Sequence, residues 1–323
     1  MTNSTRYRAQ FSSCMPVRHR GFTLVELLIS MVLGIVVIGA LVVVYTSGSA
    51  ASRNAQAQSQ MNEDAQMAMA VITNELRQAG YNPMRPANGV GFKTPLLDAS
   101  GLGWTLRACD TGFKDNTKAI SALECNTTGS STSLAVVYEG DLYSGKNTGT
   151  PKPMDCIGTG VDETTGAPPE SYKYYIMQSR LFIKDNALNC TGGGDLTQSQ
   201  ILAENIESMT VNFAIGDPST NTTPQLVVGY LNASDIATVT TAADWTDATP
   251  HLLTEPERWN KVVAARVCIV VMSENTVLNE LGSSGSNPTY TNCSNVSTDI
   301  TDGKLRRAYR TTVLLRNHGV GYV

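Results

Sequence analysis

The most apolar part of the chain lies near its N-terminus and predicts a long helix. Between Phe22 and Tyr45 the only polar side chains are Thr23, Glu26 and Ser30. A helix needs roughly 20 mostly apolar residues to cross a bilayer. The segment is therefore long enough to span a membrane.

The helical pattern continues beyond this apolar segment. Apolar residues recur there at steps of three and four, at Met61, Ala65, Ala68, Ile72, Leu76 and Ala79. This spacing places them on one stripe of a helix, which would pack on a globular domain. Gly80 and the nearby Pro83 are a helix-stop signal. We predict one helix from about Phe22 to Ala79, with Met61 and the methionines at 67–69 on its packing face.

The rest of the chain alternates between strand-like runs and polar loops. Residues 84–130 predict loops, as do the stretches at 144–170, 191–200, 216–224 and 282–303. The runs that predict strands are Leu134–Tyr138, Tyr172–Ile183, Ile206–Ile215, Gln225–Leu231, Val262–Met272 and Arg310–Leu315. We expect an α+β fold with one β-rich domain after the helix and no division of that domain.

The charge balance argues against nonspecific nucleic-acid binding. Charged residues make up 16% of the chain and the formal net charge is −4. Residues 1–21 carry four arginines and no acidic residue, so their removal would leave −8. Binding to phosphates requires basic surface. We predict no specific nucleic-acid partner.

The cysteines indicate an oxidising compartment. Cys14 precedes the apolar segment, and the other six lie in the polar body at Cys109, Cys125, Cys156, Cys190, Cys268 and Cys293. An even number in a low-charge domain favours disulfides. Pairing in sequence order closes the shortest loops and is our prediction; buried free thiols are the alternative. A zinc site is not expected, because the body has no CxxC pair and the histidines at 19, 251 and 318 are far apart.

Glu26 is the anomaly in the apolar segment. A carboxylate within a membrane span costs roughly 2.5–3.5 kcal/mol on insertion scales and therefore suggests a function. If the chain is cut between Gly21 and Phe22, a new α-amine lies about one turn before Glu26 and can neutralise it. The basic residues ahead of the segment predict a cytoplasmic N-terminus. A cleaved secretory signal fits less well, because the apolar run is too long and no small-residue site follows it.

The residues from Arg20 to Ile29, RGFTLVELLI, resemble the signal of type IV prepilins and of type II secretion pseudopilins. The resemblance implies that a membrane peptidase cuts after Gly21 and methylates Phe22, and that Glu26 guides docking into the filament. Arg18 and Arg20 would belong to the basic leader. The implied regions are a leader (1–21), a membrane and filament-core helix (22–45), its amphipathic continuation (46–80) and an antiparallel β-rich head (81–323).

Two features indicate which kind of pilin the chain resembles. Many major pilins have a proline partway along the apolar helix, whereas the segment 40–44 has none, which favours a minor pilin or a pseudopilin. The segments 206–213, 259–273 and 306–317 resemble strands of the PilW family of minor pilins. The resemblance covers the N-terminal helix and the last third of the chain.

The PilW resemblance implies a non-enzymatic assembly protein without a cofactor. Its partners would be prepilin peptidase, other minor and major pilins, and a tip adhesin. The precursor would sit in the inner membrane with its head in the periplasm, and the mature chain in a pilus at the cell surface. There it would prime or cap assembly and support twitching motility, adhesion and DNA uptake.

Three alternatives remain. A J-type pseudopilin of type II secretion shares the N-terminus, and neighbouring genes would distinguish it. A membrane-anchored enzyme would need catalytic residues, and no HExxH, Walker-type or GxSxG motif is present. A membrane-anchored surface receptor or adhesion subunit could be tested by binding assays with the head.

The leader also suggests a second start site. Residues 15–21 alone would form a short basic leader of the kind typical of prepilins, so translation could begin at Met15 instead of Met1. Intact mass spectrometry of the precursor, from cells that lack the peptidase, tests this hypothesis. A precursor that retains Met1 would exclude the internal start.

Overall fold

The computed structural model describes residues 21–81, 103–140, 152–165, 173–216, 227–238, 254–277 and 287–318. By compactness the chain divides after Ser52 into two units. The leader residues Arg18 and Arg20 and the alternative start Met15 lie outside the described residues, as does His251.

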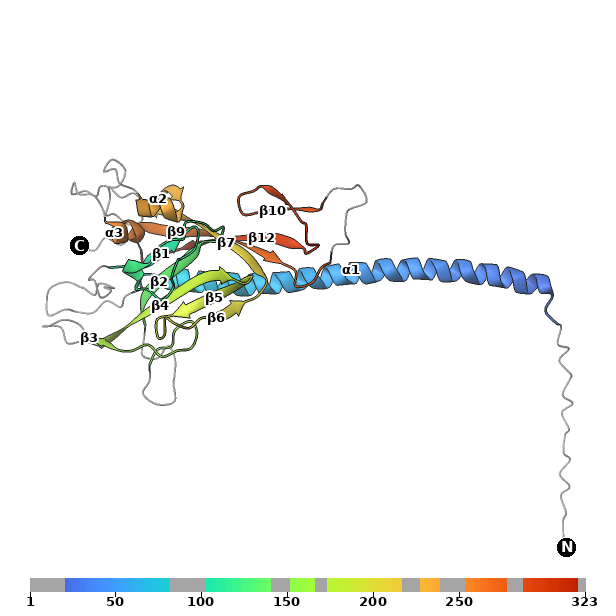
Figure 1. Cartoon of the computed structure of the whole chain (residues 1–323), viewed down its shortest axis with the longest axis horizontal. Coiled ribbons are helices and arrows are strands. Elements are labelled where there is room, and N and C mark those ends of the chain that lie inside the picture. The colour runs from blue at the N-terminus through green and yellow to red at the C-terminus, as the bar shows by residue number, and fades with distance from the viewer. Residues whose placement is uncertain are drawn as a thin grey trace, which may run out of the picture. The chain divides into compact units, whose positions relative to one another are not determined.

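Helix α1 (Leu24–Gln78) is the first element (Figure 1). Its ends lie within two residues of the predicted ones, so the single long helix is confirmed. The predicted stripe is also confirmed, because each of its six residues from Met61 to Ala79 is at most 3% exposed. Met67 is an exception to the predicted packing face. Its side chain is 58% exposed. Successive residues of an α-helix are about 100° apart around the axis, so Met67 lies off the stripe that contains Ala65 and Ala68.

The C-terminal end of α1 is completed by residues from the far end of the chain. Gly80 has φ of +71°, the left-handed conformation that often ends a helix. The side chain amide of Asn317 donates hydrogen bonds to the carbonyl oxygens of Arg77 (3.0 Å) and Ala79 (3.2 Å). A Cβ at Gly80 would lie 2.9 Å from the ring of His318, so only glycine fits there without movement.

The first sheet is antiparallel and follows the order β1-β2-β4-β5-β6, with β3 also paired to β4. Its strands are β1 (Leu106–Cys109), β2 (Ser133–Gly140), β3 (Thr164–Thr165), β4 (Lys173–Lys184), β5 (Ala187–Gly192) and β6 (Gln200–Ala203). Asp185 and Asn186 join β4 to β5 with φ of 52° and 55°. Two positive φ values in succession are typical of a tight type I′ hairpin turn, for which Asp and Asn are favoured.

The second sheet is antiparallel and follows the order β12-β9-β7-β8. Its strands are β7 (Ile206–Gly216), β8 (Val227–Leu231), β9 (Val262–Met272) and β12 (Arg306–Leu314). A separate hairpin consists of β10 (Thr289–Thr291) and β11 (Ser297–Asp299). The short helices are η1 (Ile120–Ala122), α2 (Ala233–Thr238) and α3 (Glu255–Asn260).

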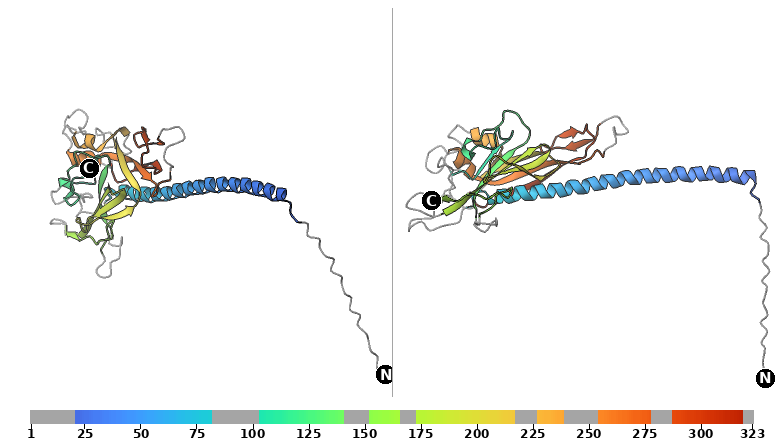
Figure 2. Two further views of the ribbon diagram at one scale, coloured as in Figure 1. Left: turned by 45° about the vertical axis from the view of Figure 1, so that its right-hand side comes forward. Right: turned by 60° about the horizontal axis from the view of Figure 1, so that its bottom comes forward.

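Both sheets share one hydrophobic core with the second half of α1. The core includes Leu134 from β2, Phe213 from β7, Ile269 from β9 and Leu76 from the helix, all fully buried. Figure 2 shows from two further directions that both sheets gather around the same end of α1. The backbone N–H of Thr132, directly before β2, donates to the carbonyl oxygen of Met209 in β7 (2.7 Å), so a hydrogen bond also joins the start of β2 to the second sheet.

The predicted strands are present among the described residues, with shifted ends in most cases. The strand predicted at Arg310–Leu315 begins four residues earlier, as β12. The prediction that 84–130 is all loop is wrong, because β1 and η1 lie within it. Strands β3, β5, β6, β10 and β11 and helices α2 and α3 were also not predicted; β3 lies in the predicted loop 144–170, and β10 and β11 lie in the predicted loop 282–303. Each of these elements has six residues or fewer and lacks the apolar run of the strands that were predicted.

Three disulfides link the six cysteines of the body. The bonds are Cys109–Cys125, Cys156–Cys190 and Cys268–Cys293, which is the sequential pairing, and the Cα atoms of each pair are 5.3–6.3 Å apart. Each bond joins a strand to a segment outside that sheet: β1, β5 and β9 each provide one partner. The disulfides therefore hold irregular segments against the sheets.

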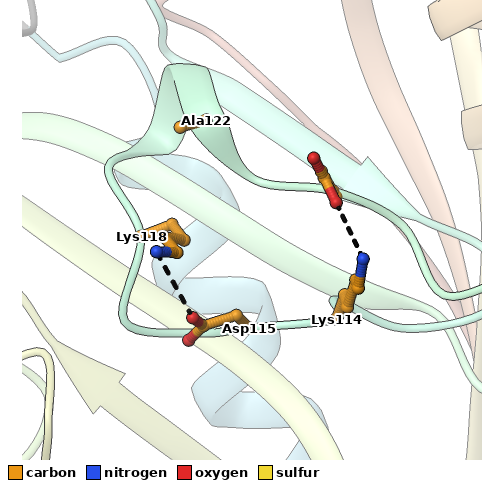
Figure 3. A pocket seen from close by; sticks show the side chains of 5 residues that line it. Lys114, Asp115, Lys118 and Ala122 are labelled. Carbon is orange, nitrogen blue, oxygen red and sulfur yellow. Dashed lines mark hydrogen bonds and ion pairs between the residues drawn. The ribbon is translucent and has the colours of Figure 1, made fainter.

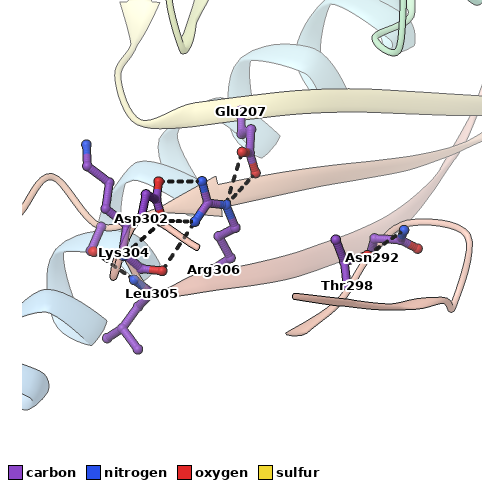
Figure 4. A network of polar contacts seen from close by, with 8 residues as sticks. Glu207, Asn292, Thr298, Asp302, Lys304, Leu305 and Arg306 are labelled. Atoms are coloured by element: carbon purple, nitrogen blue, oxygen red, sulfur yellow. Dashed lines mark hydrogen bonds and ion pairs between the residues drawn. The ribbon is translucent and has the colours of Figure 1, made fainter. Parts of the chain in front are cut away.

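Arg306 at the start of β12 forms a charged cluster with two acidic residues (Figure 4). Its Nε donates to Glu207 of β7 at 2.9 Å, and its two terminal nitrogens donate to Asp302 at 2.6 and 2.8 Å. The hydrogen bonds from Arg306 hold the pKa of the Asp302 carboxyl well below its usual range. The cluster ties β12 to β7 across the intervening strand β9.

Truncation of the α1 stripe should destabilise the head. We expect Leu76→Ala to lower the free energy of unfolding by about 2–5 kcal/mol, because it leaves a cavity at a fully buried site. Met67→Ala is the control; its side chain is largely exposed, so the expected change is within about 0.5 kcal/mol. Denaturant titration followed by tryptophan fluorescence reports on the head, because all three tryptophans follow residue 100. Equal effects of the two variants would contradict the assignment of Leu76 to the buried stripe.

His318 should make the head less stable in acid. Burial lowers the pKa of its imidazole to about 4, against the usual value near 6.5. The unfolded chain therefore takes up a proton at a higher pH than the folded chain does. The stability that results is present above pH 6.5 and is lost as the pH falls towards 4, by up to about 3 kcal/mol.

The measurement is the free energy of unfolding between pH 7 and 4. His318→Gln should give a shallower loss of stability than the unaltered chain in this range. His251→Gln provides the control, because His251 is the other histidine that follows residue 21. The same pH profile in the His318→Gln variant and the unaltered chain would refute the attribution of this loss of stability to His318.

Candidate assembly site

Glu26 and Thr23 form a reciprocal cap at the N-terminus of α1. The backbone N–H of Thr23 donates to the Glu26 carboxylate at 3.0 Å, and the backbone N–H of Glu26 donates to the Thr23 hydroxyl oxygen at 3.2 Å. Thr23 directly precedes the first helical residue, Leu24, and Glu26 is the third. This arrangement is a capping box, which satisfies two backbone donors that a helix leaves free.

The cap places the Glu26 carboxylate where its negative charge is stabilised. Its carboxylate lies at the positive end of the helix dipole, which favours a negative charge. The hydroxyl of Thr23 also donates to it, at 3.2 Å. Sequence reasoning treated Glu26 as a docking charge and as a partner of the new α-amine, and it missed the hydrogen bonds with Thr23. The Thr-x-x-Glu spacing was a readable signal for both residues.

The first half of α1 presents an apolar surface on every side. Within its own unit no side chain between Phe22 and Tyr45 is buried, and the exposed fraction is 81% at Phe22 and 78% at Tyr45. Among the described residues α1 is the one helix that is long and apolar enough to cross a membrane. So large an apolar surface needs a cover, which a membrane or other apolar helices can supply.

The structure brings together the sequence-predicted residues at this helix start. Gly21 and Phe22 directly precede the capping box, and a Cβ at Gly21 would meet no other atom within 4 Å. Phe22 is largely exposed and lies one residue before the helix cap. The bond between them is therefore not shielded by the described residues.

A small hollow in the head offers no comparable chemistry (Figure 3). Lys114, Asp115, Lys118, Ala122 and Glu124 line it. Its two cations face carboxylates, with Lys114 3.2 Å from Glu124 and Lys118 3.9 Å from Asp115. No group of three or more metal-ligating side chains occurs in the described ranges. The hollow therefore has balanced charge and no cluster of ligands.

The buried charged residues of the head have structural surroundings. Burial raises the pKa of the Glu75 carboxyl on α1, which lies near Ser179 of β4. Burial lowers the pKa of Arg180 to about 10, and its guanidinium donates to the carbonyl oxygen of Lys118 at 2.6 Å. Arg180 thus fastens the loop at 116–118 to β4.

Comparison with known families decides the identity. Residues 148–317 match the family model described as Type IV Pilus-assembly protein W, and residues 17–42 match the prokaryotic N-terminal methylation motif. The first match covers just over half of the chain. The chain belongs to the PilW family. It is thus a type IV pilin-like protein of a minor-pilin family, and the predicted resemblance is confirmed.

Two further proteins are similar to parts of this PilW-family chain. The pilin-like protein PilA3 of Thermus thermophilus is 39% identical over 83 residues, which is 25% of this chain and 36% of that protein. The chain thus spans about a third of the length of that curated relative. A type IV-like pilin structure from Thermus thermophilus has 11% identity and a TM-score of 0.35, over 80% of this chain and 98% of that one.

Membership of the PilW family has two direct consequences. The family and the fold are structural rather than enzymatic. The apolar first half of α1 and the motif together fit a membrane-anchored pilin.

Proposed function

We propose that this PilW-family chain is a minor pilin that primes or caps assembly of a type IV pilus. Prepilin peptidase removes residues 1–21 after the leader arginines Arg18 and Arg20 have helped to hold the N-terminus in the cytoplasm. Phe22 becomes the methylated N-terminus. The head then lies in the periplasm, and after assembly at the cell surface with other minor and major pilins and a tip adhesin.

One observation carries this proposal: an exposed apolar surface begins at Phe22, the residue that the cut would expose, and continues along the first half of α1. The segment 22–45 serves first as the membrane anchor and then as the filament-core helix. The amphipathic continuation, 46–80, connects it to the head, 81–323. Because α1 has no internal proline, its hydrogen-bond ladder can continue between the two environments.

The role of Glu26 follows from its position beside the new amine. In the membrane the amine of its own chain can neutralise the carboxylate, and in a filament the amine of a neighbouring subunit can do so. A charge pair in an apolar medium is worth much more than one in water. Glu26 therefore favours the one axial position at which a neighbouring Phe22 amine lies next to it. The incorporated chain would support twitching motility, adhesion and DNA uptake.

The capping box supplies a sharp test of that role. Glu26→Gln keeps a side chain that can complete the cap but removes the charge. We expect normal cleavage and at least about a tenfold loss of the chain from purified pili, since a lost charge pair in an apolar site exceeds about 1.4 kcal/mol. Glu26→Ala should show the same loss. Immunoblots of sheared pili and of membranes measure both steps.

Thr23→Ala is the matched control. It removes the other half of the cap, which is worth about 1 kcal/mol, but keeps the charge. We expect this variant to be cleaved and incorporated at close to the normal level. Normal incorporation of Glu26→Gln would refute the docking charge. A loss with Thr23→Ala as large as that with Glu26→Gln would instead assign Glu26 to helix capping.

A further inference from the structure

The second sheet has an outer face that does not line the core. Directly opposite residues of neighbouring strands point to the same face of a sheet. Leu314 of β12 lies opposite Ala264 of β9, which lies opposite Ala214 of β7, which lies opposite Tyr230 of β8. The core face carries the alternate residues, such as Phe213. These four residues therefore form one row across the outer face.

The adjoining rows bring cations next to this row. The next row contains Thr312, Arg266 and Asn212, and the following row contains Arg310, Cys268 and Thr210. We call Tyr230, Arg266, Arg310, Thr312 and Leu314 the outer patch. All five side chains are exposed, with Leu314 at 63% and Tyr230 at 43%.

Arg266 is held in a fixed position on the patch. Its guanidinium carbon lies 4.1 Å from the centre of the Tyr230 ring, which is within the range of a cation–π contact. The two residues come from strands on opposite sides of β7, so the contact reaches across that strand. Ala214 of β7 is fully buried although it belongs to the outer face. The contact between Arg266 and Tyr230 thus joins the two strands that flank β7.

The charge of the patch is positive and is not balanced by the described residues. None of the described side chains in its rows is a carboxylate. Arg310 donates to the backbone oxygen of Asn292 (2.7 Å) and the side chain oxygen of Asn295 (2.9 Å), both neutral. By contrast, Arg306, on the same strand, is paired with Asp302 and Glu207 (Figure 4).

We propose that the outer patch binds an acidic polypeptide segment of another subunit of the same pilus. Arg266 would pair with a carboxylate of that segment, and Leu314 and Tyr230 would cover an apolar side chain beside it. The inference rests on the proposed function, because it names the chemistry of a neighbour in the filament.

The composition of the patch favours a polypeptide over a nucleic acid. Tyrosine and arginine are enriched among the residues that dominate protein–protein binding energy, and an exposed leucine adds apolar area to bury. Nucleic acids require neutralisation of many phosphates, whereas the patch contains two arginines.

Site-specific crosslinking in cells that assemble pili tests the occupant. A photoreactive amino acid replaces Leu314 in the full chain, and the crosslinked peptide is sequenced by mass spectrometry. We expect a peptide from another pilus subunit with Asp or Glu close to the crosslinked position. The same replacement at Ile201 is the control; that side chain is 56% exposed but lies on β6 of the first sheet. It should not give this peptide.

Charge reversal then tests the mechanism. Arg266→Glu should lower the crosslink yield at Leu314 at least about tenfold, because it replaces attraction by repulsion. Reversal of the partner's acidic residue to Lys should restore the yield. Lys184→Glu makes the same change in charge at an exposed site of the first sheet and should leave the yield unchanged. Arg266→Gln should give an intermediate loss and provides a milder variant if reversal disturbs folding.

Several outcomes would overturn the inference. They are a crosslink to nucleic acid, the absence of any crosslink, or a yield that Arg266→Glu and Arg266→Gln leave unchanged. Pili that contain the chain but show no crosslink at Leu314 would refute the patch alone. Pili from which the unaltered chain is missing would refute the proposed function itself.

Discussion

Burial of one apolar stripe on the second half of α1 is the interaction on which the head depends. The stripe lies in the shared core of both sheets, and its residues are almost fully buried from Met61 to Ala79. Without it the inner faces of both sheets would be open to water, because each sheet contributes to that same core. The helix is therefore a structural element of the head as much as a connection to it.

The same helix has a different relation to solvent along its first half. There the apolar residues surround the helix and find no cover within their own unit. A helix that is hydrophobic all round belongs in a membrane or among other helices. Alanine, serine, glutamine and asparagine dominate the segment 50–60 that separates the two regimes, which contains no large apolar side chain. The backbone is thus helical in both halves of α1, and only the side chains differ between the half that is apolar on all sides and the half that packs in the head.

Periodicity explains which parts of this structure could be predicted from the sequence. Helix α1 has a repeated pattern over many turns, and β9 is an apolar run interrupted by Arg266, so both were predicted almost to the residue. The strand β1 has four residues within a turn-rich region, which is too short for a pattern. The hairpin β10–β11 has mostly polar residues and is tied to β9 by the bond between Cys268 and Cys293. This covalent link to β9 depends on the folded chain and does not appear in the hydrophobic pattern of the sequence.

The candidate sites differ in the same way. The pair Thr23 and Glu26 is local, so its spacing was visible in the sequence. Tyr230 and Arg266 become neighbours only through the register of β8, β7 and β9, which no local pattern specifies. The sequential disulfide pairing followed from loop length, and the structure contains the same three bonds.

The end of α1 adds a constraint on the order of events during folding. The amide of Asn317 and the ring of His318 complete this helix end, although they lie more than 230 residues further along the chain. Synthesis from the N-terminus delivers α1 first and these two residues almost last. Until then the last turn of α1 lacks the Asn317 amide, and the core lacks β12. Synthesis of nearly the whole polypeptide must therefore precede closure of the head.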